Sequence, residues 1–337
     1  MTTTRPLVSA TILAMAGVLT VPATPAAART PAEPRGHIRY LSGIGVSDFS
    51  DLYDIRPDRG HRRLLLTDLD DRLPGNAAVS PYGARPGYSP DLRTVVYQGD
   101  DGGVWKARPD GAGNPQRILP PLDTGVDPYC VVSCRLTNPV FSPDGTQVAS
   151  LEAGLSGELA RLIVFDADGS HVRAFPVSEH GQAMKLQGSF SWTADGTTVA
   201  YAMGPEDSQR SALHVTDTRT GATTQLTDGR SWRIDADISP DGRFVAYSST
   251  EPVGYDYHAD RDLFIIRVDT RAVRQLTDTD SLWESSPVWS PRGDWIAYSR
   301  QPADMTTPVK PSVRRISADG SVDRPLDVNG RVYAWVR

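Results

Sequence analysis

The chain has 337 residues, of which 39% are hydrophobic and 23% are charged, and its formal net charge is −6. This composition excludes a disordered chain, and the acidic balance argues against a protein that binds nucleic acid through a basic surface. The 29 glycines and 27 prolines follow no collagen-like period. They indicate many tight turns between short strands, and so an all-β protein.

The N-terminal segment has the order of a secretory signal peptide. Arg5 precedes an apolar run at 7–21, and a stretch of alanines that ends at Ala28 supplies a cleavage site. The apolar run is shorter than the roughly 20 residues that a membrane-spanning helix needs. We therefore predict a signal peptide at 1–28, an N-terminal linker at 29–36, and a mature protein that is secreted, soluble and without a membrane span.

The chain contains two cysteines, Cys130 and Cys134. Because an exported protein enters an oxidising compartment, we predict that they form a local disulfide. So short a ring would fix the shape of one loop more than it would raise the stability of the whole protein. A metal pair is the alternative, although a structural zinc site would need further Cys or His ligands.

One motif recurs five times, at intervals of 46 to 53 residues. Each copy has an apolar residue, then Ser-Pro-Asp-Gly or a close variant, then a strand that resembles Val-Ala-Tyr. The copies are Tyr88–Tyr97, Phe141–Ser150, Trp192–Tyr201, Ile238–Tyr247 and Trp289–Tyr298. Because proline presets φ at the second turn position and glycine accepts a positive φ, each copy predicts a β-hairpin.

A second set of hairpins and two single strands complete the pattern. Six further hairpins, with turns such as those at Asp110 and Asp168, alternate with the first five. His37–Ser42 and Arg331–Val336 are strands without a neighbouring partner in sequence. Pairing them would close a ring and leave no long unpaired edge. We predict an all-β, six-bladed β-propeller of four-stranded antiparallel blades at 37–337, closed by pairing of the N- and C-terminal strands in one blade.

The repeated Ser-Pro-Asp-Gly…Val-Ala-Tyr hairpins, with Leu-Thr-Asp endings, resemble the WD40-like PD40 repeats of the TolB-type six-bladed β-propeller. The resemblance covers residues 37–337 and implies the fold, but unrelated functions share such folds. The periplasmic namesake of the family binds a peptidoglycan-associated lipoprotein and has an extra N-terminal α/β domain, for which this sequence leaves no room. Related propellers precede the hydrolase domain of prolyl oligopeptidase-like peptidases. The absence of a Gly-x-Ser-x-Gly motif from this sequence argues against a serine peptidase.

Each blade of such a propeller has two kinds of connection. The Ser-Pro-Asp-Gly turns and the outer hairpin turns lie on one face of the ring, the turn face. The longer connections lie on the other, the loop face, where we expect binding. The predicted binding residues on the loop face are Asp235, Asp237, Trp232, Trp283, Glu284, Tyr255, Tyr257 and His180. The alternatives are that the acids only solvate the rim and that the tryptophans pack between blades.

One loop suggests a metal site. Asp256, His258 and Asp260 alternate and would share one side of an extended segment, where carboxylate and imidazole groups suit a divalent ion. The alternative is a solvated polar loop. By contrast, the turn residues Asp144 and Asp241 are expected to hold the turn backbone and not to act in catalysis.

Two functional hypotheses follow. The first is a monomeric, non-catalytic scaffold that binds a protein or cell-envelope partner through the loop face and needs no cofactor, with a divalent metal at the Asp256 loop as the alternative. The alternative is an extracellular polysaccharide lyase or hydrolase, in which loop-face carboxylates and a histidine, with or without the metal, transfer protons. That alternative requires Asp235, Glu284 and His258 to converge in one pocket.

Overall fold

The structure, a computed structural model, describes residues 33–42, 51–58, 61–67, 87–122, 135–153, 160–177, 184–186, 190–205, 210–232, 235–250, 260–303 and 309–337. Every regular element in these ranges is a β-strand. The described residues accordingly hold no helix that could cross a membrane.

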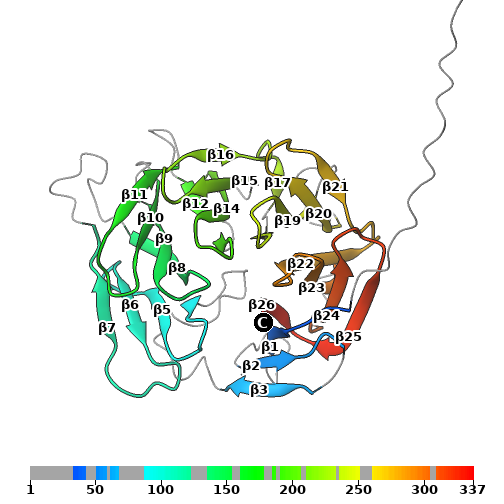
Figure 1. Cartoon of the computed structure of the whole chain (residues 1–337), viewed down its shortest axis with the longest axis horizontal. Coiled ribbons are helices and arrows are strands. Elements are labelled where there is room, and N and C mark those ends of the chain that lie inside the picture. Colours follow the sequence, from blue (N-terminus) through cyan, green and yellow to red (C-terminus); the bar gives the residue numbers. More distant parts are fainter. Residues whose placement is uncertain are drawn as a thin grey trace, which may run out of the picture. The chain divides into compact units, whose positions relative to one another are not determined.

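The strands form six antiparallel sheets placed around a ring, as Figure 1 shows. Given from the innermost strand outward, blade one is β26 (Arg331–Val336), β1 (His37–Ser42), β2 (Asp51–Ile55) and β3 (Arg63–Leu66). Blade two is β4 (Gly87–Tyr88), β5 (Val95–Gln98), β6 (Val104–Ala107) and β7 (Gln116–Leu119). Blade three is β8 (Arg135–Phe141), β9 (Gln147–Ala153), β10 (Arg161–Asp166) and β11 (Arg173–Pro176).

Blades five and six are equally regular. Blade five is β18 (Ala236–Ile238), β19 (Phe244–Ser249), β20 (Asp262–Arg267) and β21 (Val273–Gln275). Blade six is β22 (Leu282–Trp289), β23 (Trp295–Pro302), β24 (Ser312–Ser317) and β25 (Asp323–Asn329).

Blade four has an interrupted inner and outer edge. Its inner edge is β12 (Met184–Leu186) and β13 (Ser191–Trp192), both paired with β14 (Thr198–Pro205). Its outer edge is β16 (Thr223–Gln225) and β17 (Ser231–Trp232), both paired with β15 (Arg210–Asp217). The blade thus remains four strands wide, and the predicted six-bladed, four-stranded propeller is confirmed.

Ring closure occurs within blade one, as predicted. The last strand, β26, pairs antiparallel with β1, and this pairing places Ile38 opposite Trp335 and Tyr40 opposite Val332. The indole nitrogen of Trp335 also donates to the carbonyl oxygen of Arg35 at 2.9 Å. The two ends of the propeller therefore share one sheet, which removes the free edges that each strand would otherwise expose.

The repeated turn is held by its own side chains. In blade three, Oδ1 of Asp144 accepts hydrogen bonds from Ser142 Oγ at 2.6 Å and from the backbone nitrogen of Thr146 at 3.0 Å. Gly145 adopts a φ of +74°, in the left-handed region that favours glycine. Asp241 accepts equivalent bonds in blade five. These aspartates therefore hold the turn backbone, as predicted.

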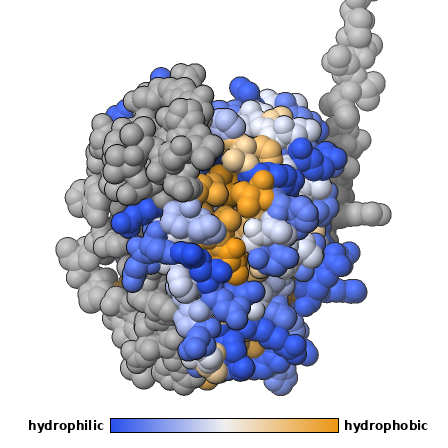
Figure 2. All heavy atoms as spheres, turned by 90° about the vertical axis from the view of Figure 1, so that its left-hand side faces the viewer, coloured by the Kyte–Doolittle hydropathy of each residue, from blue (hydrophilic) through white to orange (hydrophobic). Residues whose placement is uncertain are grey.

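The core lies between neighbouring blades. Its largest fully buried side chains are tyrosines, and Tyr40, Tyr201, Tyr247 and Tyr298 are each 0% exposed. Tyr247 of blade five, for example, packs in one cluster with Leu213 of blade four. The outer side that β7, β10 and β11 present is mostly hydrophilic, with one apolar patch among the described residues (Figure 2). Each blade is therefore stabilised mainly by apolar burial against the next blade.

Candidate functional site

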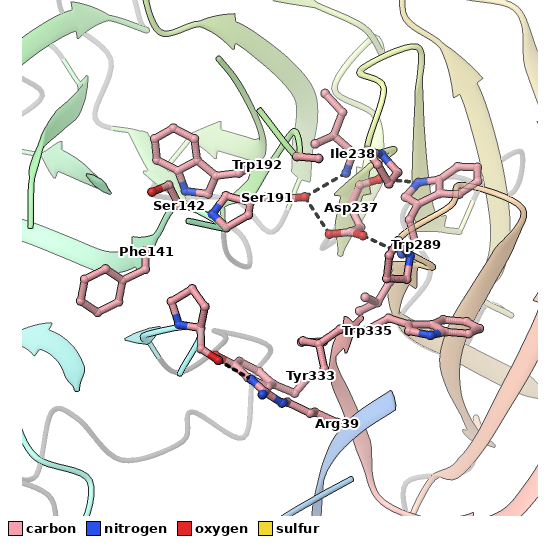
Figure 3. Close-up of a pocket in the computed structure, with 18 of the residues that line it drawn as sticks. Arg39, Phe141, Ser142, Ser191, Trp192, Asp237, Ile238, Trp289, Tyr333 and Trp335 are labelled. Atoms are coloured by element: carbon pink, nitrogen blue, oxygen red, sulfur yellow. Dashed lines mark hydrogen bonds between the residues drawn. The ribbon is translucent and has the colours of Figure 1, made fainter. Parts of the chain in front are cut away.

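A cavity of about 630 Å³ lies where the inner strands of all six blades converge. Its wall includes the second residue of each repeated turn, so it opens on the turn face. These turn residues are Pro90, Pro143, Ala194, Pro240 and Pro291. Figure 3 shows the cavity between the inner strands of the blades.

Three tryptophans hold the wall from behind: Trp192 and Trp289, each directly before one of these turns, and Trp335 on β26. Trp192, Trp289 and Trp335 are only 8%, 4% and 6% exposed. In Figure 3 their indole rings point away from the centre of the cavity and into the blades. The wall therefore consists mainly of prolines and apolar residues with a few serines, and the tryptophans fix it by packing into the blades.

Asp237, on β18, joins three blades at this wall. Its Oδ1 accepts a hydrogen bond from Ser191 Oγ of blade four at 2.7 Å, and its Oδ2 accepts one from the backbone nitrogen of Trp289 of blade six at 2.7 Å. Ser191 Oγ in turn accepts from the backbone nitrogen of Ile238 at 2.9 Å. Asp237 is 7% exposed, and both of its carboxylate oxygens accept hydrogen bonds that hold the wall.

Two cationic side chains also line the cavity. Arg39, on β1, donates from Nη1 to the carbonyl oxygen of Pro90 at 3.2 Å, and thereby links blades one and two. Arg337 follows β26 and is exposed. The oxygens of the wall acids, Asp144 and Asp237, accept hydrogen bonds from the scaffold, so Arg39 and Arg337 supply the charged hydrogen-bond donors that remain open to a ligand.

The structure places Glu284 inside the protein and away from this cavity. It lies near the start of β22, is 0% exposed, and accepts at Oε1 from Arg300 Nε at 2.7 Å and from Thr279 Oγ1 at 2.9 Å. Burial raises the pKa of Glu284 to about 7, against the opposing effect of the Arg300 charge. Its Oε2 has no hydrogen-bond partner within the described ranges. Glu284 and Arg300 form a buried ion pair within blade six.

The other predicted loop-face residues that are described take part in contacts between and beside the blades. Asp235 Oδ2 accepts from the backbone nitrogen of Ser286 at 3.1 Å. Trp283 is 8% exposed, with the guanidinium of Arg261 at 5.5 Å from a ring centroid. Neither Asp235 nor Trp283 lines the cavity. Of Trp232 the structure describes the backbone, which lies in β17.

Most of the predicted metal site lies beyond the part of the chain that the structure describes. Asp260 is described, and its Oδ1 accepts from the backbone nitrogen of Ser281 at 2.6 Å. The predicted residues outside the described ranges are Asp256, His258, Tyr255, Tyr257, His180, Cys130 and Cys134. Within those ranges, no three metal-ligating side chains gather as a metal site requires. The metal site and the disulfide remain predictions.

The turn-face cavity is the feature that sequence reasoning missed. The sequence does contain a pattern that indicates this cavity. The turn repeat places one apolar residue and one Pro or Ala at equivalent positions of five blades. The greater length of the loop-face connections instead favoured the loop face as the binding surface. Within the described residues, however, it is the equivalent turns that converge on a common cavity.

Comparisons with known proteins give the fold but few details of function. No protein-family model matches the chain. An uncharacterized protein of Agrobacterium fabrum is 25% identical over 223 residues, which cover 65% of this chain and 66% of that protein. An uncharacterized peptidase of Bacillus subtilis is 33% identical over 110 residues, which cover 31% of this chain and 16% of the peptidase. The chain thus matches less than two thirds of either relative.

Solved structures agree on a six-bladed propeller. A protein assigned to TolB from Agrobacterium tumefaciens superposes with a TM-score of 0.53 at 20% identity, over 89% of this chain and 91% of that one. TolB from Acinetobacter baumannii gives 0.54 at 19% identity, over 91% and 68%. An oligogalacturonate lyase in complex with manganese gives 0.51 at 13% identity, over 72% and 64%. The chain has the TolB-type six-bladed propeller fold, as the repeats predict.

Proposed function

We propose that the chain is an exported, non-catalytic scaffold that binds a protein or cell-envelope partner in the turn-face cavity. The cavity carries this proposal, because all six blades contribute to it and its volume of about 630 Å³ lies within the range of known ligand sites. The proposed binding surface is thus the turn face and not the loop face that the sequence favours. Several of the long loop-face connections lie partly outside the described residues.

The acidic side chains Asp237 and Glu284 are engaged in contacts within the protein, which favours binding over catalysis. A general acid or base must reach the substrate, whereas Asp237 uses both carboxylate oxygens to hold neighbouring blades. Glu284, which the lyase or hydrolase alternative would use, is buried beside Arg300. The oligogalacturonate lyase shares only the fold with this chain, and therefore adds no support for a polysaccharide substrate.

Export rests on the N-terminal pattern of Arg5, the apolar run and the alanines that end at Ala28. Expression in a bacterium that secretes proteins, followed by mass measurement of the extracytoplasmic product, should give a protein that begins at Arg29. A full-length product confined to the cytoplasm would contradict export.

Site-specific photo-cross-linking tests the binding role. Ala194 is exposed and lines the cavity, so a photoreactive phenylalanine at this position should cross-link a partner in the cell envelope of the source organism. Val273 is 51% exposed on the outer strand β21 and serves as the matched control. A specific adduct at Ala194 that is absent at Val273 would support the proposal. Equal adducts at both positions, or none at Ala194, would refute it.

A further inference from the structure

The charged side chains of the cavity wall differ in how far they are hydrogen-bonded. Four of them line the cavity within the described residues, namely Arg39, Asp144, Asp237 and Arg337. Asp144 accepts hydrogen bonds from its own turn, and Asp237 accepts them from Ser191 and Trp289. Among the residues that the structure describes, neither Arg39 nor Arg337 forms an ion pair with a carboxylate of the wall. A ligand that enters therefore meets carboxylates whose oxygens already accept hydrogen bonds, and guanidinium groups with donors that remain available.

Arg39 is held at the wall without a carboxylate of its own. Its cross-strand neighbour is Asp54, but Oδ2 of Asp54 accepts from Arg63 at 2.8 Å and lies 3.5 Å from His37 Nδ1. Nη1 of Arg39 donates to Pro90, while its buried Nε has no hydrogen-bond partner among the residues that the structure describes. Burial lowers the pKa of Arg39, although Tyr333 and Asp54 oppose this effect. The guanidinium is thus partly desolvated and incompletely bonded.

A carboxylate is the group that suits this arginine best. A guanidinium presents paired N–H donors that match the two oxygens of a carboxylate, and partial burial strengthens such a bond relative to one in water. Most of the other residues of the wall are prolines and apolar residues, and these suit an extended peptide that carries one charged group. The ligand should therefore be anionic at one point and apolar elsewhere.

Resting on the proposed function, we infer that the turn-face cavity is a peptide site in which Arg39 binds a carboxylate of the partner, supported by Arg337. The carboxylate comes from the C-terminus of the partner or from an Asp or Glu side chain. Both sources offer the same chemistry to Arg39. A peptide library separates them.

The test uses the purified chain on a solid support and two randomised hexapeptide libraries, one with free and one with amidated C-termini. Mass spectrometry of the bound peptides should show enrichment of free ends, or of Asp and Glu in both libraries. Arg39→Gln should reduce the bound fraction at least about tenfold, because a hydrogen bond to a charged group is lost, while Arg39→Lys keeps part of it. Arg93→Gln removes a charge that is 87% exposed on the blade-two turn outside the cavity, and should bind like the wild type.

Three results would overturn the inference: equal binding by Arg39→Gln and wild type, no preference for carboxylates, or equal losses in Arg39→Gln and Arg93→Gln. Thermal unfolding of each variant ensures that a loss of binding is not a loss of fold. Cross-linking from Ala194 separates the two proposals. An adduct of equal yield in wild type and Arg39→Gln would leave the proposed function standing and remove the carboxylate site. Failure of the wild type to form that adduct would refute the proposed function itself.

Discussion

Asp237 and Trp289 are joined by two hydrogen bonds that run between blades five and six. The backbone nitrogen of Trp289 donates to Oδ2 of Asp237 at 2.7 Å, and its indole nitrogen donates to the carbonyl oxygen of Asp237 at 3.0 Å. Both residues line the turn-face cavity. One aspartate thus connects adjacent blades at the wall where a ligand would bind.

Replacing this carboxylate should weaken the whole ring. In Asp237→Asn, the amide group presents an N–H donor toward Ser191 Oγ or Trp289 N, so one buried donor is left without an acceptor. The expected cost is about 1–3 kcal/mol in the free energy of unfolding, measured by urea denaturation. Asp269→Asn, at an exposed aspartate beside Arg267, is the matched control and should unfold like the wild type. An Asp237→Asn protein as stable as that control would contradict the structural role.

The buried Glu284 should make stability depend on pH. Its pKa is about 7 in the folded protein and 4.5 ordinarily, so between these values the folded state holds a proton that the unfolded state has lost. Its contribution is therefore complete below about pH 4.5 and is lost as pH rises to 7, with a slope of at most about 1.4 kcal/mol per pH unit.

Urea denaturation of wild type and Glu284→Gln across pH 4 to 8 measures this effect. The difference in unfolding free energy between the two proteins should move in favour of Glu284→Gln as the pH rises through this window, because Gln does not titrate. Thr279 can still donate to the Gln oxygen. A difference that stays constant across the window would show that Glu284 does not titrate there.

Ring closure should depend on the last strand. Trp335 is 6% exposed, packs with Ile38, Val288 and Trp295, and donates to Arg35. Trp335→Ala should cost about 3–5 kcal/mol in unfolding free energy, since it leaves a cavity between blades one and six. Trp335→Phe keeps most of the apolar contact and should cost less. Loss of stability no greater than about 0.5 kcal/mol in Trp335→Ala would contradict closure through this strand.

Metal removal tests the loop of Asp256, His258 and Asp260. A bound ion would raise the melting temperature by mass action, since it binds only the folded state. The scaffold account predicts that EDTA leaves the Tm unchanged, and that calcium, manganese or zinc afterwards do not raise it. A fall in Tm with EDTA that one metal reverses would instead support a metal site in this loop and would favour the polysaccharide enzyme.

The propeller could be predicted because the residues that define each hairpin turn are close together in the sequence. Ser142, Asp144 and Gly145 define a turn within a few residues, and the turn recurs at a nearly constant interval. The pairing of β1 with β26 could be predicted as well, since two strands without partners remained in an otherwise complete count of hairpins. The repeated hairpins were therefore sufficient to predict both the blade structure and the closure of the ring.

The cavity could not be predicted in this way, because it depends on how separate blades converge. Nothing around Arg39 in sequence indicates that it will contact Pro90, which is 51 residues away. Likewise, Trp283 and Glu284 read as part of a connection, but β22 begins at Leu282 and includes both of them. Glu284 then lies opposite Arg300, and pairing of the two strands buries it. Because β22 extends over Trp283 and Glu284, both residues lie in a packed strand and not in an exposed loop.

The most direct test of the central claim is the photo-cross-linking yield at Ala194 compared with Val273, measured in the cell envelope of the source organism. The binding account predicts one specific adduct at Ala194, in the cavity, and none at Val273, on the outer strand. No adduct at Ala194, or the same adducts at both positions, would contradict a partner site in the turn-face cavity.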